Sequence, residues 1–101
     1  MISLSLTEIA SAIDGQLVGQ DTNISQIVTD SRTLQSGELF LALKGPNFDG
    51  HRFIAKVIEQ GCKAVIVEQQ QSIDIPQIVV ADTHAALGRI GAYVKSKVAR
   101  T

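Results

Sequence analysis

The chain has 101 residues, which is the size of one domain. Hydrophobic residues make up 45% and charged residues 19% of the sequence, which excludes a disordered tail. The formal net charge is −1, and aromatic residues account for only 4%. The sequence therefore has neither the basic patch nor the base-stacking side chains that are typical of nucleic-acid-binding proteins, and no nucleic-acid partner is expected.

The chain has one cysteine, Cys62, which excludes an internal disulfide framework and a zinc site made of several cysteines. No basic segment opens the sequence, and Glu8 comes early, so no signal peptide is expected. The longest apolar run, residues 39–43, is far shorter than the roughly 20 residues that span a bilayer. We expect a soluble cytoplasmic protein with no membrane partner.

The first predicted element is a helix with a capping box. Ser5 is in the N-cap position, and Glu8 follows three residues later. Gly15 is expected to end the helix in a left-handed conformation. Apolar residues recur at helical spacing between these two points: Leu6, Ile9, Ala10 and Ile13.

Short strands are predicted after this helix. Residues 16–19 and 24–29 have strand-like patterns and are separated by a polar turn. A second turn at residues 34–37 leads into residues 38–43, whose continuous apolar run indicates a buried strand.

The second half alternates between helices and strands. Asp49 is expected to cap a helix over residues 50–60, which Gly61 ends. Strands are predicted at residues 64–67 and 77–81. Asp82 then caps a last helix with four apolar residues on one face: Ala86, Leu87, Ile90 and Val94.

This order of elements predicts an α/β fold. We expect a single small domain over residues 1–98, with two or three layers, a mixed sheet of about five short strands, and three helices. The end of the sequence carries charge without a C-terminal cap, and residues 99–101 are expected to begin a linker, so the sequence is interpreted as a fragment of a longer protein.

The densest polar cluster directly follows the predicted strand 24–29 and consists of Thr29, Asp30, Ser31 and Arg32. Open α/β sheets bind ligands at the carboxyl ends of their strands. The hydroxyl of Ser31 and the planar fork of Arg32 suit phosphate-containing ligands. The alternative interpretation is an ordinary turn with a solvated arginine.

A second polar cluster follows the next strand and leads into a helix: Lys44, Gly45, Pro46, Asn47 and Phe48, then Asp49, Gly50 and His51. A lysine beside a helix start favours an anion. The alternative is a plain strand–helix loop in which Phe48 packs on the core. If the two strands are parallel neighbours, both clusters lie at one edge and can share an anionic ligand. The pattern G-x-x-x-x-G-K-[S/T] of a P-loop does not occur in the sequence.

The remaining candidates are interpreted as structural. Cys62 follows a helix end and is expected to be a small packing residue. His84 is expected on the surface. No spacing of histidine, cysteine or carboxylate residues indicates a metal site, and no catalytic residue is assigned.

Three stretches together resemble a known family: residues 29–32, residues 37–45 (Gly-Glu-Leu-Phe-Leu-Ala-Leu-Lys-Gly) and residues 48–53 (Phe-Asp-Gly-His-Arg-Phe). They are similar to the N-terminal domain of the Mur ligases of peptidoglycan synthesis. The stretch 61–64 also fits, with Cys62 in place of the usual alanine. The resemblance covers essentially all of residues 1–98.

Two members of this family share this type of domain. One adds the third amino acid of the stem peptide, and the other adds D-alanyl-D-alanine. The early first helix and residues 73–83 resemble the second member more closely.

The resemblance implies a three-domain ligase. Its N-terminal domain holds UDP-N-acetylmuramoyl-tripeptide through the UDP end, and its central domain binds ATP and Mg²⁺. The ATP-dependent reaction activates the peptide carboxylate, which the amine of the dipeptide then attacks. Because the ATP-binding loop is expected beyond residue 101, this chain alone is expected to hold no cofactor and to be inactive. Its further partners are then the central and C-terminal domains of the same chain.

The resemblance also implies roles for the two clusters. Thr29, Asp30 and Ser31 are expected to neighbour the uracil and ribose, with Ser31 donating or accepting a hydrogen bond, and residues 44–48 to wall the nucleoside. Arg32 either touches the diphosphate or braces the loop through Asp30 or Asp49. A purely structural domain without a ligand remains the main alternative. A third interpretation, a stand-alone nucleotide-binding enzyme with a doubly wound fold, is disfavoured because the sequence contains no G-x-G-x-x-G turn.

Overall fold

The computed structural model describes residues 4–46 and 49–98. Its main feature is a five-stranded mixed sheet in the order β2-β7-β6-β5-β4, with a separate two-stranded ladder of β1 and β3. The strand β2 is antiparallel to β7, and the other pairs in the main sheet are parallel. The elements in chain order are β1 (Leu4–Ser5), α1 (Leu6–Ala12), β2 (Gln16–Val18), β3 (Asn23–Ile24), β4 (Ile27–Val28), β5 (Leu39–Leu41), the 3₁₀ turn η1 (Gly50–Phe53), α2 (Ile54–Glu59), β6 (Ala64–Val67), β7 (Gln77–Val79) and α3 (Thr83–Val98).

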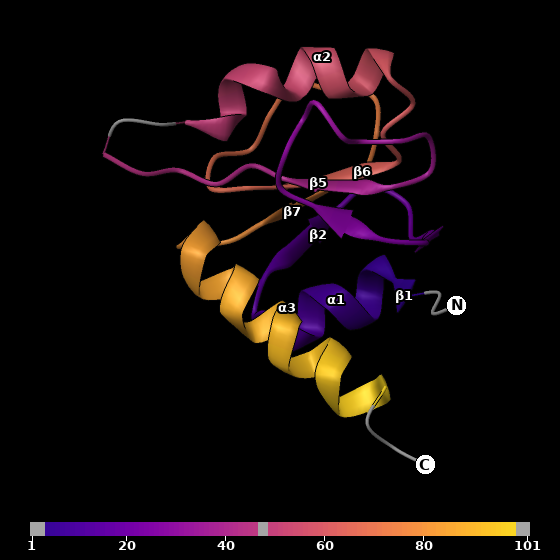
Figure 1. Ribbon diagram of the computed structural model, residues 1–101, viewed down its shortest axis with the longest axis vertical. Coiled ribbons are helices and arrows are strands. Elements are labelled where there is room, and N and C mark those ends of the chain that lie inside the picture. Colours follow the sequence, from indigo (N-terminus) through magenta and orange to yellow (C-terminus); the bar gives the residue numbers. More distant parts are fainter. Residues whose placement is uncertain (1–3, 47–48, 99–101) are drawn as a thin grey trace.

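The helices cover both faces of the sheet, so the domain has three layers (Figure 1). Alternate residues of a strand point to opposite faces. In β5, Leu39 and Leu41 pack toward α1 and α3, whereas Phe40 packs toward α2. The predicted α/β fold with a mixed five-stranded sheet and three helices is confirmed, in its three-layer form.

The capping box of α1 is present as predicted, but the helix ends differently. The Ser5 Oγ accepts from the Glu8 N–H at 3.1 Å, and the Ser5 N–H donates to the Glu8 carboxylate at 2.9 Å. The left-handed residue is Asp14, with φ 56°, and not Gly15. Gly15 is needed for space, because a Cβ there would lie 2.6 Å from Cγ2 of Ile78 in β7.

The single strand predicted at residues 24–29 is in fact two strands in two different sheets. Strand β3 pairs with β1, and β4 pairs with β5. The exposed residues Ser25 and Gln26 separate them. A local pattern cannot show this split, because it depends on which distant strand each half pairs with.

The helix predicted at residues 50–60 also has two parts. Asp49 caps the 3₁₀ turn η1, whose last residue is Phe53, and the α-helix α2 begins only at Ile54. Gly61, with φ 93°, ends the helix as predicted. The strands predicted at 16–19, 38–43 and 77–81 are shortened to the bounds given above.

The last helix begins as predicted but buries fewer of its apolar residues. Asp82 Oδ1 accepts from the N–H groups of His84 and Ala85 at 2.9 and 3.2 Å. Ala86 and Ile90 lie in the core, whereas Leu87 is 36% exposed. No helix in the described part of the chain is long and apolar enough to cross a membrane.

The glycine in the middle of α3 gives a first prediction. A Cβ at Gly88 would have no heavy atom within 4 Å. Gly88→Ala is therefore expected to raise the free energy of unfolding by about 0.5–1 kcal/mol, because alanine loses less backbone entropy in a helix. Urea unfolding measures this, with Gly15→Ala as the opposite case, since its Cβ meets Ile78. A lower urea midpoint for Gly88→Ala would contradict the open space at this position.

Candidate functional site

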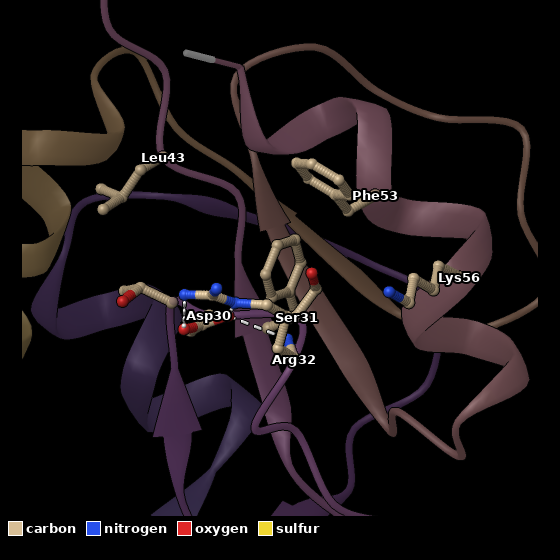
Figure 2. A pocket seen from close by; sticks show the side chains of 8 residues that line it. Asp30, Ser31, Arg32, Leu43, Phe53 and Lys56 are labelled. Atoms are coloured by element: carbon tan, nitrogen blue, oxygen red, sulfur yellow. Dashed lines mark hydrogen bonds and ion pairs between the residues drawn. The ribbon is translucent and has the colours of Figure 1, made fainter.

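A pocket of about 540 Å³ lies at the carboxyl ends of β4 and β5, between the sheet and the segment of η1 and α2 (Figure 2). The two strands are parallel neighbours, which is the condition under which the sequence predicted a shared site at this edge. The volume is in the range of small-molecule sites. Eight residues line the pocket: Thr29, Asp30, Ser31, Arg32, Phe40, Leu43, Phe53 and Lys56.

Asp30 and Arg32 form a compact turn at the rim of the pocket. The Asp30 Oδ1 accepts from the Arg32 backbone N–H at 2.8 Å and from Nε at 3.1 Å, and Oδ2 accepts from Nη2 at 3.0 Å. These side-chain hydrogen bonds from Arg32 hold the pKa of Asp30 below its usual value. Of the alternatives for Arg32, the brace through Asp30 is confirmed. The Arg32 side chain is 81% exposed, so the guanidinium also remains accessible to a ligand.

Ser31 lies at the centre of this turn and is buried, with 7% of its surface exposed. Its backbone carbonyl accepts from the Gln60 side chain at 2.9 Å, which fixes the turn against the end of α2. Its Oγ makes no hydrogen bond to the residues that the structure describes. Figure 2 shows the side chain directed into the pocket, so the hydroxyl is available to a ligand.

The opposite wall was not found from the sequence. Phe53 comes from η1 and Lys56 from α2, and Figure 2 shows both facing the turn at residues 29–32. They are three residues apart, which places them on one helical face. Phe40, which also lines the pocket, is fully buried. Their spacing in the sequence predicts that Phe53 and Lys56 share one helical face. That this face borders the pocket follows only from the packing of α2 over the sheet, which the spacing does not show.

The second predicted cluster contributes less to the pocket than expected. Lys44, Gly45 and Pro46 do not line it, although their neighbour Leu43 does. The Lys44 backbone pairs with Asp49 in an antiparallel bridge, and its N–H donates to the Thr83 Oγ1 at 3.1 Å. Asn47 and Phe48 lie outside the described residues. A ligand role for residues 44–48 therefore stays a prediction.

The remaining candidates have structural surroundings. The His51 ring contacts Asp49 and accepts from the Glu68 N–H, so it supports the start of the helical segment. The backbone N–H of His51 is the main cause of the lowered pKa of Asp49. Cys62 is buried, and this burial raises the pKa of its thiol. His84 is exposed as predicted. Residues 4–46 and 49–98 contain no group of three or more His, Cys, Asp or Glu residues that could hold a metal ion.

Comparisons with known proteins match this chain along almost its whole length. A family model described as Mur ligase family, catalytic domain, matches residues 23–97. The UDP-N-acetylmuramoyl-tripeptide–D-alanyl-D-alanine ligase of Escherichia coli is 39% identical over 98 residues, which cover 97% of this chain and 22% of that protein. The ligase of the same name from Haemophilus influenzae is 38% identical over 100 residues, again 97% of this chain and 22% of that protein.

Solved structures give the same result. A crystal structure of MurF from Acinetobacter baumannii has a TM-score of 0.87 and 42% identity, over 98% of this chain and 22% of that chain. MurF from Thermotoga maritima, crystallised with ADP, has a TM-score of 0.63 and 26% identity, over 71% of this chain and 17% of that chain. The chain thus spans about a fifth of the length of these relatives. Both the family match and the whole-chain identity show that this chain belongs to the Mur ligase family.

Proposed function

We propose that this chain binds the UDP end of UDP-N-acetylmuramoyl-tripeptide in the pocket at the ends of β4 and β5. In this proposal it is the N-terminal, substrate-anchoring domain of an ATP-dependent ligase that joins D-alanyl-D-alanine to the tripeptide. The observation that carries the proposal is the pocket itself, which is lined by the Ser31 side chain and by two cationic residues, Arg32 and Lys56. The names of the relatives supply the substrate class.

The lining of the pocket suits the parts of a uridine diphosphate. Lys56 places a cation at the pocket where a diphosphate can pair with it. Arg32 already donates from Nε and Nη2 to Asp30, and its exposed guanidinium can still offer Nη1 to a phosphate oxygen. The Ser31 hydroxyl can both donate to and accept from a ribose or uracil oxygen. Phe40, Leu43 and Phe53 give the apolar surface against which a nucleoside packs.

Anchoring at a distance gives this domain a physical role in ligation. Binding energy from a part of the substrate that does not react can hold the reacting carboxylate in place elsewhere. The sequence lacks the P-loop pattern, and the described residues contain no metal-binding cluster. In this proposal the ATP-dependent step is carried out by other parts of a multidomain ligase.

A second candidate is the same anchoring role in the ligase that adds the third amino acid. The L-lysine-adding ligase of Staphylococcus haemolyticus is 44% identical over 71 residues, which cover 67% of this chain. The D-alanyl-D-alanine ligase of Escherichia coli matches 97% of the chain. The longer match favours the D-alanyl-D-alanine ligase. The name of either relative contains a UDP-N-acetylmuramoyl group, so the proposed ligand end is common to both.

The test is a titration of the chain with UDP, followed through backbone amide NMR, with ATP as the control ligand. We expect shifts in residues 29–32, Leu43 and residues 53–56 with UDP and not with ATP. Ser31→Ala is expected to raise the Kd about 3- to 10-fold, which is the usual effect of losing one hydrogen bond. Ser96→Ala, on the exposed surface of α3, is the matched control and should leave the Kd unchanged.

Two results would contradict the proposal. Absence of shifts at millimolar UDP would show that the chain does not bind UDP by itself and would favour the purely structural domain. An unchanged Kd for Ser31→Ala would remove Ser31 from the binding site, even if UDP binds.

A further inference from the structure

A chain of hydrogen bonds, here called the His51 clamp, joins four segments next to the pocket. The His51 Nδ1 lies 2.7 Å from the Asp49 Oδ1, and the His51 Nε2 accepts from the Glu68 N–H at 2.9 Å. The Glu68 Oε2 accepts from the Thr83 N–H at 2.9 Å and from its hydroxyl at 3.0 Å. The Thr83 Oγ1 in turn accepts from the Lys44 N–H at 3.1 Å. The clamp thus connects the loop after β5, the turn η1, the end of β6 and the start of α3.

The contacts of His51 determine its protonation state. A protonated ring would form an ion pair with Asp49, but it would also carry a hydrogen on Nε2. The Glu68 N–H already points at Nε2, and a backbone N–H can only donate. Nε2 must therefore be the acceptor, and Nδ1 must carry the hydrogen that Asp49 accepts. His51 in this arrangement is neutral, with its hydrogen on Nδ1.

The clamp holds the wall of the pocket that faces the Asp30–Arg32 turn. His51 and Phe53 lie in the same 3₁₀ turn, and the ring of Phe53 lines the pocket. Next to His51, the Gly50 N–H donates to the Leu43 carbonyl at 2.6 Å, and Leu43 also lines the pocket. The His51 side chain is only 13% exposed, so packing and hydrogen bonds together fix the orientation of its ring.

We propose that His51 is a positioning residue: its neutral Nδ1–H form ties Asp49 to Glu68 and thereby places Leu43 and Phe53 at the pocket. The effect on UDP affinity rests on the proposed function, whereas the placement of Leu43 and Phe53 does not. His51 itself touches no ligand in this proposal. The Asp-Gly-His-Arg-Phe stretch is then a framework for the site, with Phe53 as the member that reaches the pocket.

The first test is the tautomer of His51, measured in the unaltered chain by ¹⁵N NMR of the imidazole rings at neutral pH. We expect a protonated Nδ1 and an unprotonated Nε2 for His51. His84, the other histidine of the chain, is exposed and serves as the internal reference. An Nε2–H tautomer or a doubly protonated ring for His51 would overturn the proposal, and this result does not depend on any variant being folded.

The second test uses two half-mimics of the imidazole. The amide of His51→Asn can take the place of Nδ1 and keep the contact with Asp49. The amide oxygen of His51→Gln can take the place of Nε2 and keep the contact with Glu68. Neither keeps both contacts, so both variants are expected to shift the NMR signals of Leu43 and Phe53 without ligand and to raise the Kd for UDP about 3- to 10-fold. His84→Gln is the matched control and should change neither.

The outcomes separate this proposal from the proposed function. If the unaltered chain binds UDP and both His51 variants bind it equally well, with unmoved Leu43 and Phe53 signals, the positioning role is wrong. If the unaltered chain does not bind UDP, the proposed function fails. The tautomer and the ligand-free signals of Leu43 and Phe53 then still decide whether His51 places this wall.

Discussion

Phe40→Ala is expected to lower the free energy of unfolding by about 3–5 kcal/mol, the largest effect of any substitution considered. Phe40 is fully buried in β5, an interior strand between β4 and β6. Its ring packs in the layer between the sheet and α2, where alanine would leave a cavity. A domain of this size has a total stability of about 5–15 kcal/mol, so the variant should be close to unfolding at ordinary temperature.

Urea unfolding followed by circular dichroism measures this effect. Leu87→Ala is the matched control, because Leu87 is a large apolar residue with 36% of its surface exposed, and it should cost far less. Phe40 also forms part of the pocket, so any folded Phe40→Ala protein should bind UDP more weakly than the unaltered chain. Equal urea midpoints for Phe40→Ala and Leu87→Ala would contradict the placement of Phe40 in the core.

Local signals in the sequence predicted the start of α1 and the end of α2 correctly. The capping box of Ser5 and Glu8 and the helix stop at Gly61 depend on residues that are neighbours along the chain. The prediction of a single strand over residues 24–29 was wrong, because β3 pairs with β1 and β4 pairs with β5. Gly15 was assigned to a left-handed stop, whereas its real constraint is Ile78, which is distant in the sequence.

In the candidate site, too, residues with a local sequence signal were predicted and residues placed by long-range packing were missed. Residues 29–32 could be predicted because a polar cluster directly follows a strand, and a ligand at such a strand end is a general feature of α/β sheets. Phe53 and Lys56 were missed because they reach the pocket only through the packing of α2 over the sheet. The contact of His51 with Glu68 joins residues that are 17 positions apart, and no spacing rule predicts such a pair.

The Asp49-Gly50-His51 stretch lies beside the pocket, and its hydrogen bonds show that it can support the site without touching a ligand. Asp49 accepts from the His51 N–H at 3.0 Å and also from its ring, so one carboxylate both caps the turn and orients the histidine. Gly50 between them is buried against the loop after β5. Each of the three residues thus has a structural requirement of its own, and together they join the helical wall of the pocket to the sheet.

Gly50→Ala is expected to break this junction. A Cβ at Gly50 would lie 3.0 Å from each of three backbone atoms, namely the Ala42 Cα, the Leu43 N and the Leu43 O. These backbone atoms directly follow β5 and cannot move aside as a flexible side chain can, so we expect a loss of about 1–3 kcal/mol of unfolding free energy, as for other overpacked positions. The hydrogen bond from Gly50 to Leu43 lengthens in the same step.

Two measurements decide this prediction. Urea unfolding should show a lower midpoint for Gly50→Ala, whereas Gly88→Ala, the same substitution where a Cβ has open space, should show a higher one. Amide NMR should show shifts at Leu43 and His51 in Gly50→Ala, together with weaker UDP binding, because η1, which carries Phe53, moves away from the segment after β5. A folded Gly50→Ala protein with an unchanged midpoint would mean that η1 does not lie against β5 as closely as the structure places it, and the His51 clamp would lose its means of acting on the pocket.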